Sequence, residues 1–353
     1  MVAKDEDRNC QGIDDRPESK FSHTVTFYRA GTTGWKDEVP YNAPTQMDRL
    51  AAGISFVDLK FRQTPRIVAT AVLHGASGVA LIDPGPTSTL PTLRHGLDEA
   101  GISMTDVTSI VLTHIHLDHA GATGTLIQEN PRQKVYVHEK GARHLVDPER
   151  LLASATRLYG DAMDSLWGEV RPVPQESLVV LAGGEQFEAG GRELRVEYTP
   201  GHASHHVSYF NSDSGIAFVG DTVGIKRTAN GYVLPPTPPP DIDLEAWEVS
   251  LSRIERWRPA TLFLTHFGPS APVGPHVTGF RESLALVADL ARASLVRDEG
   301  DEAREAWFAD QVRLELRRRL GEADASAYEV AGRFDLNWRG LARYLRKSEP
   351  RLP

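Results

Sequence analysis

The sequence predicts an α/β fold, and three observations support this prediction. Short strand-like runs recur along the chain up to Thr265, and helical apolar stripes separate several of them. From about Pro275 onward the pattern is helical. The 353 residues, 40% hydrophobic and 25% charged, have the composition of a globular protein and suffice to bury a substantial core.

The expected strands are short runs that are apolar or alternate between apolar and polar residues. In chain order they are Val25–Tyr28, Ile54–Phe61, Ile67–Leu73, Val79–Asp83, Ser109–Thr113, Lys134–His138, Glu193–Thr199, His206–Phe210, Gly215–Gly220 and Thr261–Thr265. A turn of sequence D-P-G-P ends the fourth run.

Helices are expected where apolar residues recur every three or four positions. One follows that turn and ends at Gly101, and another, Leu244–Trp257, has Asp243 as its expected N-cap. The proline-rich segment 235–240 is expected to be a stiff extended connector. Two further stripes lie in the C-terminal part, namely Phe280, Leu284 and Val287, and then Phe308, Val312, Leu316 and Leu320.

These patterns divide the chain into three parts. Residues 1–20 are charged and almost without apolar side chains, so we expect a disordered tail. Residues 21–274 carry the strands and are expected to form one α/β domain. Residues 275–353 are expected to form a C-terminal helical extension.

Composition also restricts partners and location. A formal net charge of −9 disfavours nucleic acid and anionic membranes as partners. No apolar run approaches the length of a bilayer span, and the first residues lack the apolar core of a secretory signal. The single cysteine, Cys10, excludes a disulfide framework and a thiolate metal site. We therefore expect a cytoplasmic protein acting on a small molecule, and a homodimer stays open.

The segment T-H-I-H-L-D-H-A-G, residues 113–121, has three of the 13 histidines and an aspartate within six positions. In an extended segment, side chains two apart point the same way, so His114 and His116 can hold one cation. Asp118 and His119 follow as the chain turns and can face a second. A lone histidine or aspartate is usually only a hydrogen-bonded residue, but this density favours a metal site.

Three further candidates, His202, Asp221 and His266, each come just after a strand-like run. Because the ends of neighbouring strands converge at one edge of a sheet, these side chains can meet the first group. The set provides three protein ligands for each of two cations, with Asp221 as the natural bridge. Three protein ligands leave open positions on each metal, as in catalytic sites.

Four motifs in this order resemble those of the metallo-β-lactamase superfamily of metallohydrolases, and within it the glyoxalase II-like branch. They are T-H-I-H-L-D-H-A-G (113–121), T-P-G-H (199–202), F-V-G-D-T (218–222) and L-T-H (264–266). The likeness covers about residues 50–270. It implies an αββα four-layer sandwich of two mixed β-sheets flanked by helices, so residues 21–274 would be the hydrolase domain, followed by the helical extension.

The resemblance also implies a division of the ligands by motif position. His114, His116 and His202 would hold the first metal. The second would be held by Asp118, His119 and His266, with Asp221 bridging.

Such a pair of divalent ions, roughly 3.5–4 Å apart, lowers the pKa of a shared water to about 7 and supplies hydroxide for hydrolysis. Asp118 is the expected catalytic residue, since it can also orient the nucleophile. Zinc is the default metal, and iron or manganese suits the same imidazole and carboxylate ligands. The expected reaction is hydrolysis of a carboxylic ester, thioester or lactone.

Three other functions stay open. A phosphodiesterase would use the same metal pair, although the acidic chain disfavours a nucleic-acid substrate. An iron-dependent oxidoreductase with one iron would need fewer ligands. A non-catalytic binding protein on this fold would be expected to have lost ligands, and none is missing. A β-lactamase would be in the wrong compartment.

Substrate choice is expected to depend on flanking segments. Tyr159, Met163 and Trp167 share one stripe of the apolar segment Leu151–Trp167, which is either a lid lining an acyl pocket or ordinary packing. Tyr232 is a candidate catalytic residue that either hydrogen-bonds an oxyanion or caps a loop.

Other polar residues near these segments have modest expected roles. The loop 222–241 is not expected to grip glutathione, which disfavours a glutathione thioester. His205 and His206 are expected to support the ligands. The arginines of the C-terminal helix form either a solvated face or a phosphate or coenzyme A contact, and they are Arg313, Arg317, Arg318 and Arg319.

Overall fold

The computed structural model describes residues 25–26, 38–39, 47–228 and 232–349, and the chain divides into two units, Met1–Pro44 and Thr45–Pro353. In the first unit β1 (Val25–Thr26) pairs antiparallel with β2 (Glu38–Val39). The expected tail, residues 1–20 with Cys10, lies outside the described residues, as do Phe27 and Tyr28. The three domain boundaries stay predictions.

A seven-stranded mixed sheet forms the first part of the second unit, in the order β3-β4-β5-β6-β7-β8-β9. Neighbours are antiparallel from β3 to β6 and parallel from β6 to β9. The strands are β3 (Met47–Ala51), β4 (Ile54–Asp58), β5 (Ala69–Gly75), β6 (Gly78–Ile82), β7 (Val107–Val111), β8 (Lys134–His138) and β9 (Leu178–Leu181).

A six-stranded sheet, in the order β10-β11-β12-β13-β14-β15, packs against the first. Its pairs are antiparallel except β13 with β14, which are parallel. The strands are β10 (Gln186–Ala189), β11 (Arg192–Tyr198), β12 (Val207–Asn211), β13 (Ile216–Phe218), β14 (Thr261–Leu264) and β15 (Gly268–Ser270).

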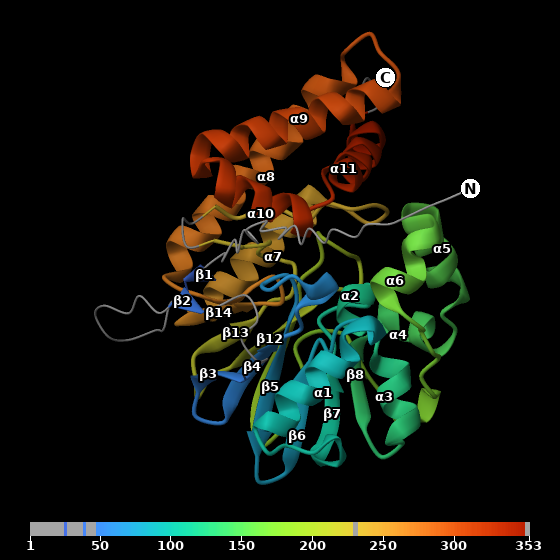
Figure 1. Cartoon of the computed structure of the whole chain (residues 1–353), viewed down its shortest axis with the longest axis vertical. Coiled ribbons are helices and arrows are strands. Elements are labelled where there is room, and N and C mark those ends of the chain that lie inside the picture. Colours follow the sequence, from blue (N-terminus) through green and yellow to red (C-terminus); the bar gives the residue numbers. More distant parts are fainter. Residues whose placement is uncertain (1–24, 27–37, 40–46, 229–231, 350–353) are drawn as a thin grey trace, which may run out of the picture. The chain divides into compact units, whose positions relative to one another are not determined.

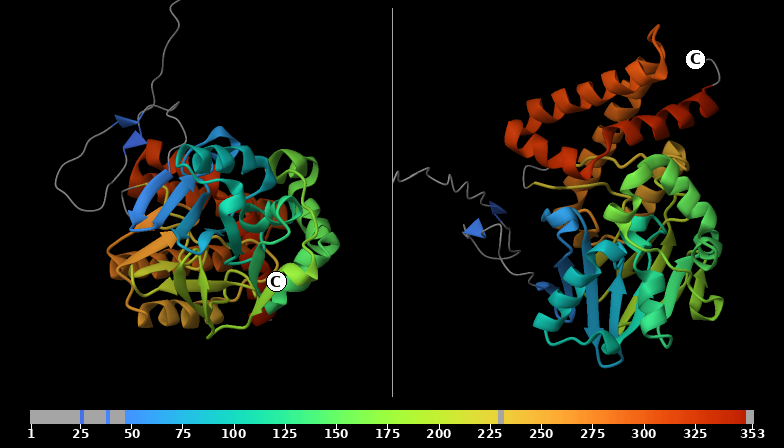
Figure 2. Two further views of the ribbon diagram at one scale, coloured as in Figure 1. Left: turned by 90° about the horizontal axis from the view of Figure 1, so that it is seen from below. Right: turned by 45° about the vertical axis from the view of Figure 1, so that its right-hand side comes forward.

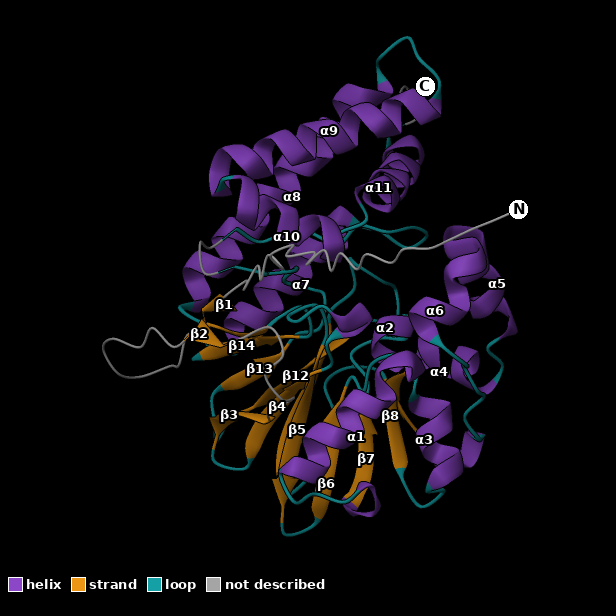
Figure 3. Ribbon diagram, in the orientation of Figure 1, coloured by secondary structure: helices purple, strands orange, loops and turns teal. Residues whose placement is uncertain are grey.

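Three buried clusters show the layering of the second unit. One lies between the sheets and includes Phe56 of the first and Tyr209 of the second. Another packs the first sheet against α1 (Leu90–Glu99), α3 (Thr123–Glu129) and α4 (Glu139–Val146). The third packs the second sheet against α7 (Leu244–Arg256) and α8 (Val273–Leu295). The expected αββα sandwich is confirmed (Figures 1 and 3).

The C-terminal helices continue the third cluster. After α8 come α9 (Asp301–Leu320), α10 (Glu322–Ala331) and α11 (Phe334–Ser348), and their buried side chains include Phe308, Tyr328 and Trp338. These helices gather at the end of the sheets where α2 (Leu117–Ala120) lies (Figures 1 and 2). The expected helical C-terminal part is therefore present.

Two expected elements are wrong in extent. The strand Ile54–Phe61 ends at Asp58, whose carboxylate accepts hydrogen bonds from the backbone amides of Lys60 and Arg66 and so closes a loop. The stripe Leu151–Trp167 is two helices, α5 (Glu149–Tyr159) and α6 (Met163–Trp167), because Gly160 breaks it at a φ of 51°.

Asp243 caps α7 as expected, accepting a hydrogen bond from the backbone amide of Ala246. In the described part of the chain, every helix is too short or too polar to cross a membrane.

Candidate metal centre

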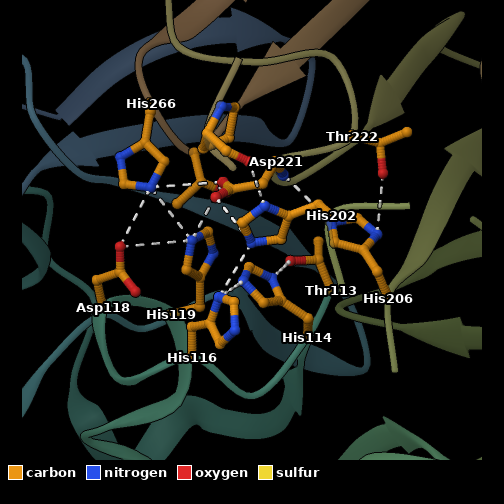
Figure 4. Close-up of polar contacts among 12 residues, drawn as sticks. Thr113, His114, His116, Asp118, His119, His202, His206, Asp221, Thr222 and His266 are labelled. Carbon is orange, nitrogen blue, oxygen red and sulfur yellow. Dashed lines mark hydrogen bonds and ion pairs between the residues drawn. The ribbon is translucent and has the colours of Figure 1, made fainter. Parts of the chain in front are cut away.

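All the expected ligands lie at one edge of the two sheets, on loops or on the short helix α2. His114 and His116 follow β7, and Asp118 and His119 lie on α2, which comes next. The remaining three follow strands of the second sheet: His202 after β11, Asp221 after β13 and His266 after β14. The structure brings all of them together (Figure 4).

One group of ring nitrogens belongs to His114, His116 and His202. Nδ1 of His116 lies 3.0 Å from Nε2 of His114 and 3.0 Å from Nε2 of His202. Three nitrogens at this spacing can coordinate one cation. The group coincides with the ligand set that the motifs imply for the first metal.

A second group comprises Asp118, His119 and His266. The Nε2 atoms of the two histidines are 3.2 Å apart, and Oδ2 of Asp118 lies 3.3 Å from Nε2 of His266. The side chain of Asp118 is 27% exposed, whereas that of His119 is fully buried. Solvent therefore reaches this group from the side of Asp118.

Asp221 lies between the two groups. Its Oδ2 is 3.4 Å from Nε2 of His202, and its Oδ1 is 3.3 Å from Nε2 of His119 and 3.4 Å from Nε2 of His266. Each carboxylate oxygen thus faces a different group, as a bridging ligand requires.

In each histidine, one ring nitrogen faces the other candidate ligands (the inner nitrogen) and one faces away from them (the outer nitrogen). When the outer nitrogen carries the proton, the inner nitrogen keeps its lone pair. Nδ1 of His202 donates to the carbonyl of Pro236 (2.8 Å), and Nδ1 of His266 donates to that of Ile67 (2.6 Å). Nδ1 of His119 donates to the carboxylate of Asp83 (2.8 Å). In their neutral form, which a bound metal requires, these rings therefore direct lone pairs inward, which is the arrangement of metal-binding histidines.

The carboxylate oxygens and imidazole lone pairs that face one another in the site are all hydrogen-bond acceptors. Among the residues described, Oδ1 of Asp221 is buried and without a hydrogen-bond partner, although two imidazole lone pairs face it. Lone pairs and carboxylates at such distances repel one another. Divalent cations relieve this repulsion, so the residues present fit a metal site.

The two groups differ in charge. Burial lowers the pKa of His114, and burial and the charge of His202 lower the pKa of His116 to about 4, so these rings are neutral at pH 7. Burial opposes protonation of His119, but the charges of Asp221 and Asp118 outweigh it and raise its pKa. The negative charge that attracts a proton there would equally hold a divalent cation.

Asp83 is a supporting residue that the sequence did not reveal. Its buried carboxylate accepts hydrogen bonds from the backbone and hydroxyl of Thr113 and from the hydroxyl of Thr265, all at 2.8 Å, besides that from His119. It thus joins both sheets under the second group. Its place just after a strand was the only available signal, and we interpreted it as a turn residue.

His206 supports Asp221, as expected of a residue near the ligands. Nε2 of His206 accepts a hydrogen bond from the backbone amide of Asp221 (3.2 Å). Gly220, the residue before Asp221, has a φ of 47°, which favours glycine. A Cβ at this position would also lie 2.5 Å from Oγ1 of Thr113, so glycine is required. His205 stacks on His114 with a ring separation of 6.0 Å.

Tyr232 is not brought together with the ligands. Its side chain is buried in the cluster of the C-terminal helices, with its ring 5.7 Å from that of Tyr328. Burial raises the pKa of Tyr232 to about 12, opposed by a hydrogen bond with Ser283. These contacts fit the loop-packing alternative, and the catalytic role stays a prediction without contacts to favour it.

Two of the three residues expected to line a pocket, Tyr159 and Trp167, form an aromatic wall together with Phe61. The Trp167 ring stacks on Phe61 at 5.6 Å and meets Tyr159 edge-on at 5.0 Å. Trp167 is buried, whereas Tyr159 and Met163 are partly exposed. Burial and then the charge of Asp118 raise the pKa of Tyr159. The pocket role stays a prediction.

The arginines of α9 are ion-paired. Arg318 and Arg319 bind Glu315, Arg317 binds Glu322, and Arg313 lies near Asp310 and Glu329. This pairing matches the solvated-face alternative.

Comparison with known proteins adds a family match. The sequence model of the Metallo-beta-lactamase superfamily matches residues 64–266. A metallo-beta-lactamase fold-containing protein of Sulfurisphaera tokodaii is 32% identical over 211 residues, which are 59% of this chain and 76% of that protein.

A hydroxyacylglutathione hydrolase of Synechococcus is 31% identical over 144 residues. The match covers 41% of this chain and 43% of that enzyme, so the chain spans less than half of the enzyme's length. Among solved structures, a metallo-beta-lactamase family protein of Thermus thermophilus is similar with a TM-score of 0.61 at 24% identity. That alignment covers 80% of this chain and 89% of that one.

Proposed function

The chain belongs to the metallo-beta-lactamase superfamily and has the fold and candidate metal ligands of a metal-dependent hydrolase, and we propose that it uses two divalent cations to hydrolyse a carboxylic ester, thioester or lactone of a small molecule. The observation that carries the proposal is the position of Asp221, whose two oxygens face two separate groups of inward lone pairs. A site for one cation would not need this arrangement.

The first cation would be held by His114, His116 and His202, and the second by Asp118, His119 and His266, with Asp221 shared. Imidazole and carboxylate ligands without a thiolate suit zinc, our first choice, and also iron or manganese. When bound, such a pair makes hydroxide available at neutral pH and polarises the carbonyl under attack.

The chain's own residues position this chemistry. Asp83 and Pro236 fix the rings of His119 and His202 through their outer nitrogens. Asp118, the most exposed of the carboxylates here, is placed to accept a hydrogen bond from the attacking water and so orient it. The substrate approaches from the same side.

The aromatic wall supports an acyl substrate. Tyr159 packs on Trp167 and is acted on by the charge of Asp118, so we expect an apolar acyl group entering at Asp118 to meet these rings. The similarity to a hydroxyacylglutathione hydrolase supports a thioester as one member of the class. The single cysteine fits our expectation of a cytoplasmic enzyme.

The test joins a metal assay to a substrate panel. Protein purified without added metal should contain close to two equivalents of metal, and it should hydrolyse esters, thioesters or lactones faster than phosphodiesters or β-lactams. Preference for the phosphodiester would favour the alternative phosphodiesterase. Redox-active iron at one equivalent, with no hydrolysis, would contradict the proposal.

A further inference from the structure

Two arginines lie side by side on the two loops that hold His266. Arg66 belongs to the loop between β4 and β5, and Arg227 to the loop after Asp221. Nη1 of Arg227 donates to the backbone carbonyl of Arg66 (2.6 Å), and Nε of Arg66 donates to that of Arg227 (3.1 Å). The pair therefore joins the two loops.

Both arginines are anchored around His266. The backbone amide of Lys226 donates to the carbonyl of His266 (2.7 Å), while the ring of His266 donates to the carbonyl of Ile67. The guanidinium of Arg66 lies over the ring of Phe267, 4.6 Å from its centre. Since Lys226 and Ile67 are the neighbours of the two arginines, the backbones of both loops are held at His266.

The charge of Arg227 is poorly compensated. This side chain is 9% exposed, and in the described portion no carboxylate lies within ion-pair distance of it. Its Nε is buried and has no hydrogen-bond partner there. An unpaired buried cation is costly, so the fold holds Arg227 in a state that an anion would stabilise.

Other charges around the pair do not remove this imbalance. Asp58 acts on both arginines, but its oxygens already accept hydrogen bonds from the backbone amides of Lys60 and Arg66. Asp48 acts on Arg66. Lys226 adds another cation, and its Nζ donates to the hydroxyl of Ser270 (3.1 Å).

The surroundings are poorly hydrated. Burial, followed by the charge of Arg66, lowers the pKa of Arg227 to about 10. Burial raises the pKa of Asp58 to about 6 even though both arginines oppose this change. Electrostatic attraction between an anion and a guanidinium is stronger in such surroundings than at an open surface.

We propose that Arg227, with Arg66 and Lys226 beside it, binds an oxyanion of the substrate, a carboxylate or a phosphate, at the two loops that hold His266. This inference rests on the proposed function and narrows its substrates to anionic esters, thioesters or lactones. The planar fork of a guanidinium matches both oxyanions. A purely structural brace between the loops accounts for Nη1 of Arg227 but leaves its Nε and its charge unexplained.

The test compares substrates that differ by one anionic group. Succinyl- and butyryl-pantetheine differ by a carboxylate, and butyryl-4′-phosphopantetheine and butyryl-pantetheine differ by a phosphate. Arg227→Gln should raise the KM of the anionic member of one pair roughly 10- to 100-fold and leave that of butyryl-pantetheine unchanged. The pair that responds identifies the oxyanion, and equal changes for all substrates overturn the subsite.

A second variant separates binding from bracing. Asp58→Asn removes a competing negative charge and should lower the KM of the same anionic substrate, opposite in sign to Arg227→Gln. A brace predicts that both variants lose thermal stability with no charge-dependent KM. The exposed Arg195→Gln is the matched control. If Arg227→Gln does not fold, Arg66→Gln provides the same comparison.

Failure of the subsite and failure of the hydrolase function give different results. Hydrolysis by the wild type without any preference for charge overturns the subsite alone. If no substrate is hydrolysed, a thermal-shift measurement of anion binding tests the subsite instead. Succinate or inorganic phosphate should raise the Tm of the metal-loaded wild type more than that of Arg227→Gln. Equal shifts overturn the subsite.

Discussion

At the residue scale, Asp221 is the side chain on which both ligand groups depend. Its oxygens lie 3.4 Å from His202 on one side and 3.3 Å from His119 on the other. Removing a single histidine weakens one group, whereas removing this carboxylate weakens both and leaves the repulsion between two cations less screened.

Asp221→Ala should therefore lower kcat/KM further than His202→Ala does. We expect a loss beyond the roughly 10- to 100-fold that removing a partner of a metal ligand typically costs. Steady-state kinetics and metal content measured on both variants check this. The same substitution at the exposed Asp213 is the control, and near-normal turnover of Asp221→Ala would remove this residue from the site.

His276 provides a prediction of pH dependence. Its Nε2 donates to the carbonyl of Val223 (2.9 Å), its Nδ1 bonds the hydroxyl of Ser270 (2.8 Å), and burial lowers its pKa to about 4. Because the folded pKa lies below the unfolded value of 6.5, the unfolded chain binds the proton first as pH falls. The stabilisation is thus complete above about pH 6.5 and lost toward about pH 4, by about 3 kcal/mol.

Urea unfolding of the wild type and His276→Gln between about pH 4.5 and 7.5 measures this effect. The variant should be less stable at neutral pH, and the difference between the two proteins should shrink as pH falls. Because other buried histidines titrate equally in both proteins, only the difference is diagnostic. Parallel curves would show that His276 is not the group responsible.

The sequence sufficed to predict that the candidate ligands meet, because the spacing of His114, His116, Asp118 and His119 is local and places them on one loop and one helix turn. Asp83 could not be predicted, since its partners Thr113, His119 and Thr265 meet it only through tertiary structure. The position of Tyr232 also depends on tertiary structure, because the C-terminal helices bury its side chain away from the candidate ligands.

At the scale of elements, α5 and α6 connect core packing to the metal centre. Trp167 of α6 stacks on Phe61 of the β4–β5 loop, and Tyr159 of α5 touches Trp167 and is acted on by the charge of Asp118. The aromatic wall is thus buried at Trp167 and partly exposed at Tyr159. The packing alternative from the sequence fits Trp167, and the pocket alternative stays a prediction.

Trp167→Ala should destabilise the fold by about 3–5 kcal/mol, as loss of a buried aromatic side chain does. If the wall lines the pocket, the KM of octanoyl substrates should rise more than that of acetyl substrates, with kcat nearly unchanged. Trp257→Ala, whose ring stacks on Phe210 away from the wall, is the matched control for stability. Equal KM changes for both chain lengths would leave only the packing role.

The strands show which elements a sequence predicts well. β8 matches its expected bounds, Lys134–His138, because it is an interior strand with a continuous apolar run. β3, β9 and β10 were missed because they lie at or next to sheet edges and bury little. Gly160 divided an expected helix because a positive φ overrides the apolar stripe.

At the scale of the whole molecule, the sandwich gathers ligands from both sheets at one edge, and the C-terminal helices gather at that end (Figure 1). The αββα layering followed from the family resemblance. The packing of α8 to α11 onto one core cluster could not be predicted in the same way. An amphipathic stripe shows that a helix buries one face, but it does not show which element that face packs against.

The central claim is that this chain holds two cations, and anomalous diffraction from crystals of the fully metal-loaded protein tests it most directly. We predict two peaks roughly 3.5–4 Å apart. One should be bound by His114, His116 and His202, the other by Asp118, His119 and His266, with Asp221 touching both. A single peak, with Asp118 and His266 unliganded, would contradict the two-metal account.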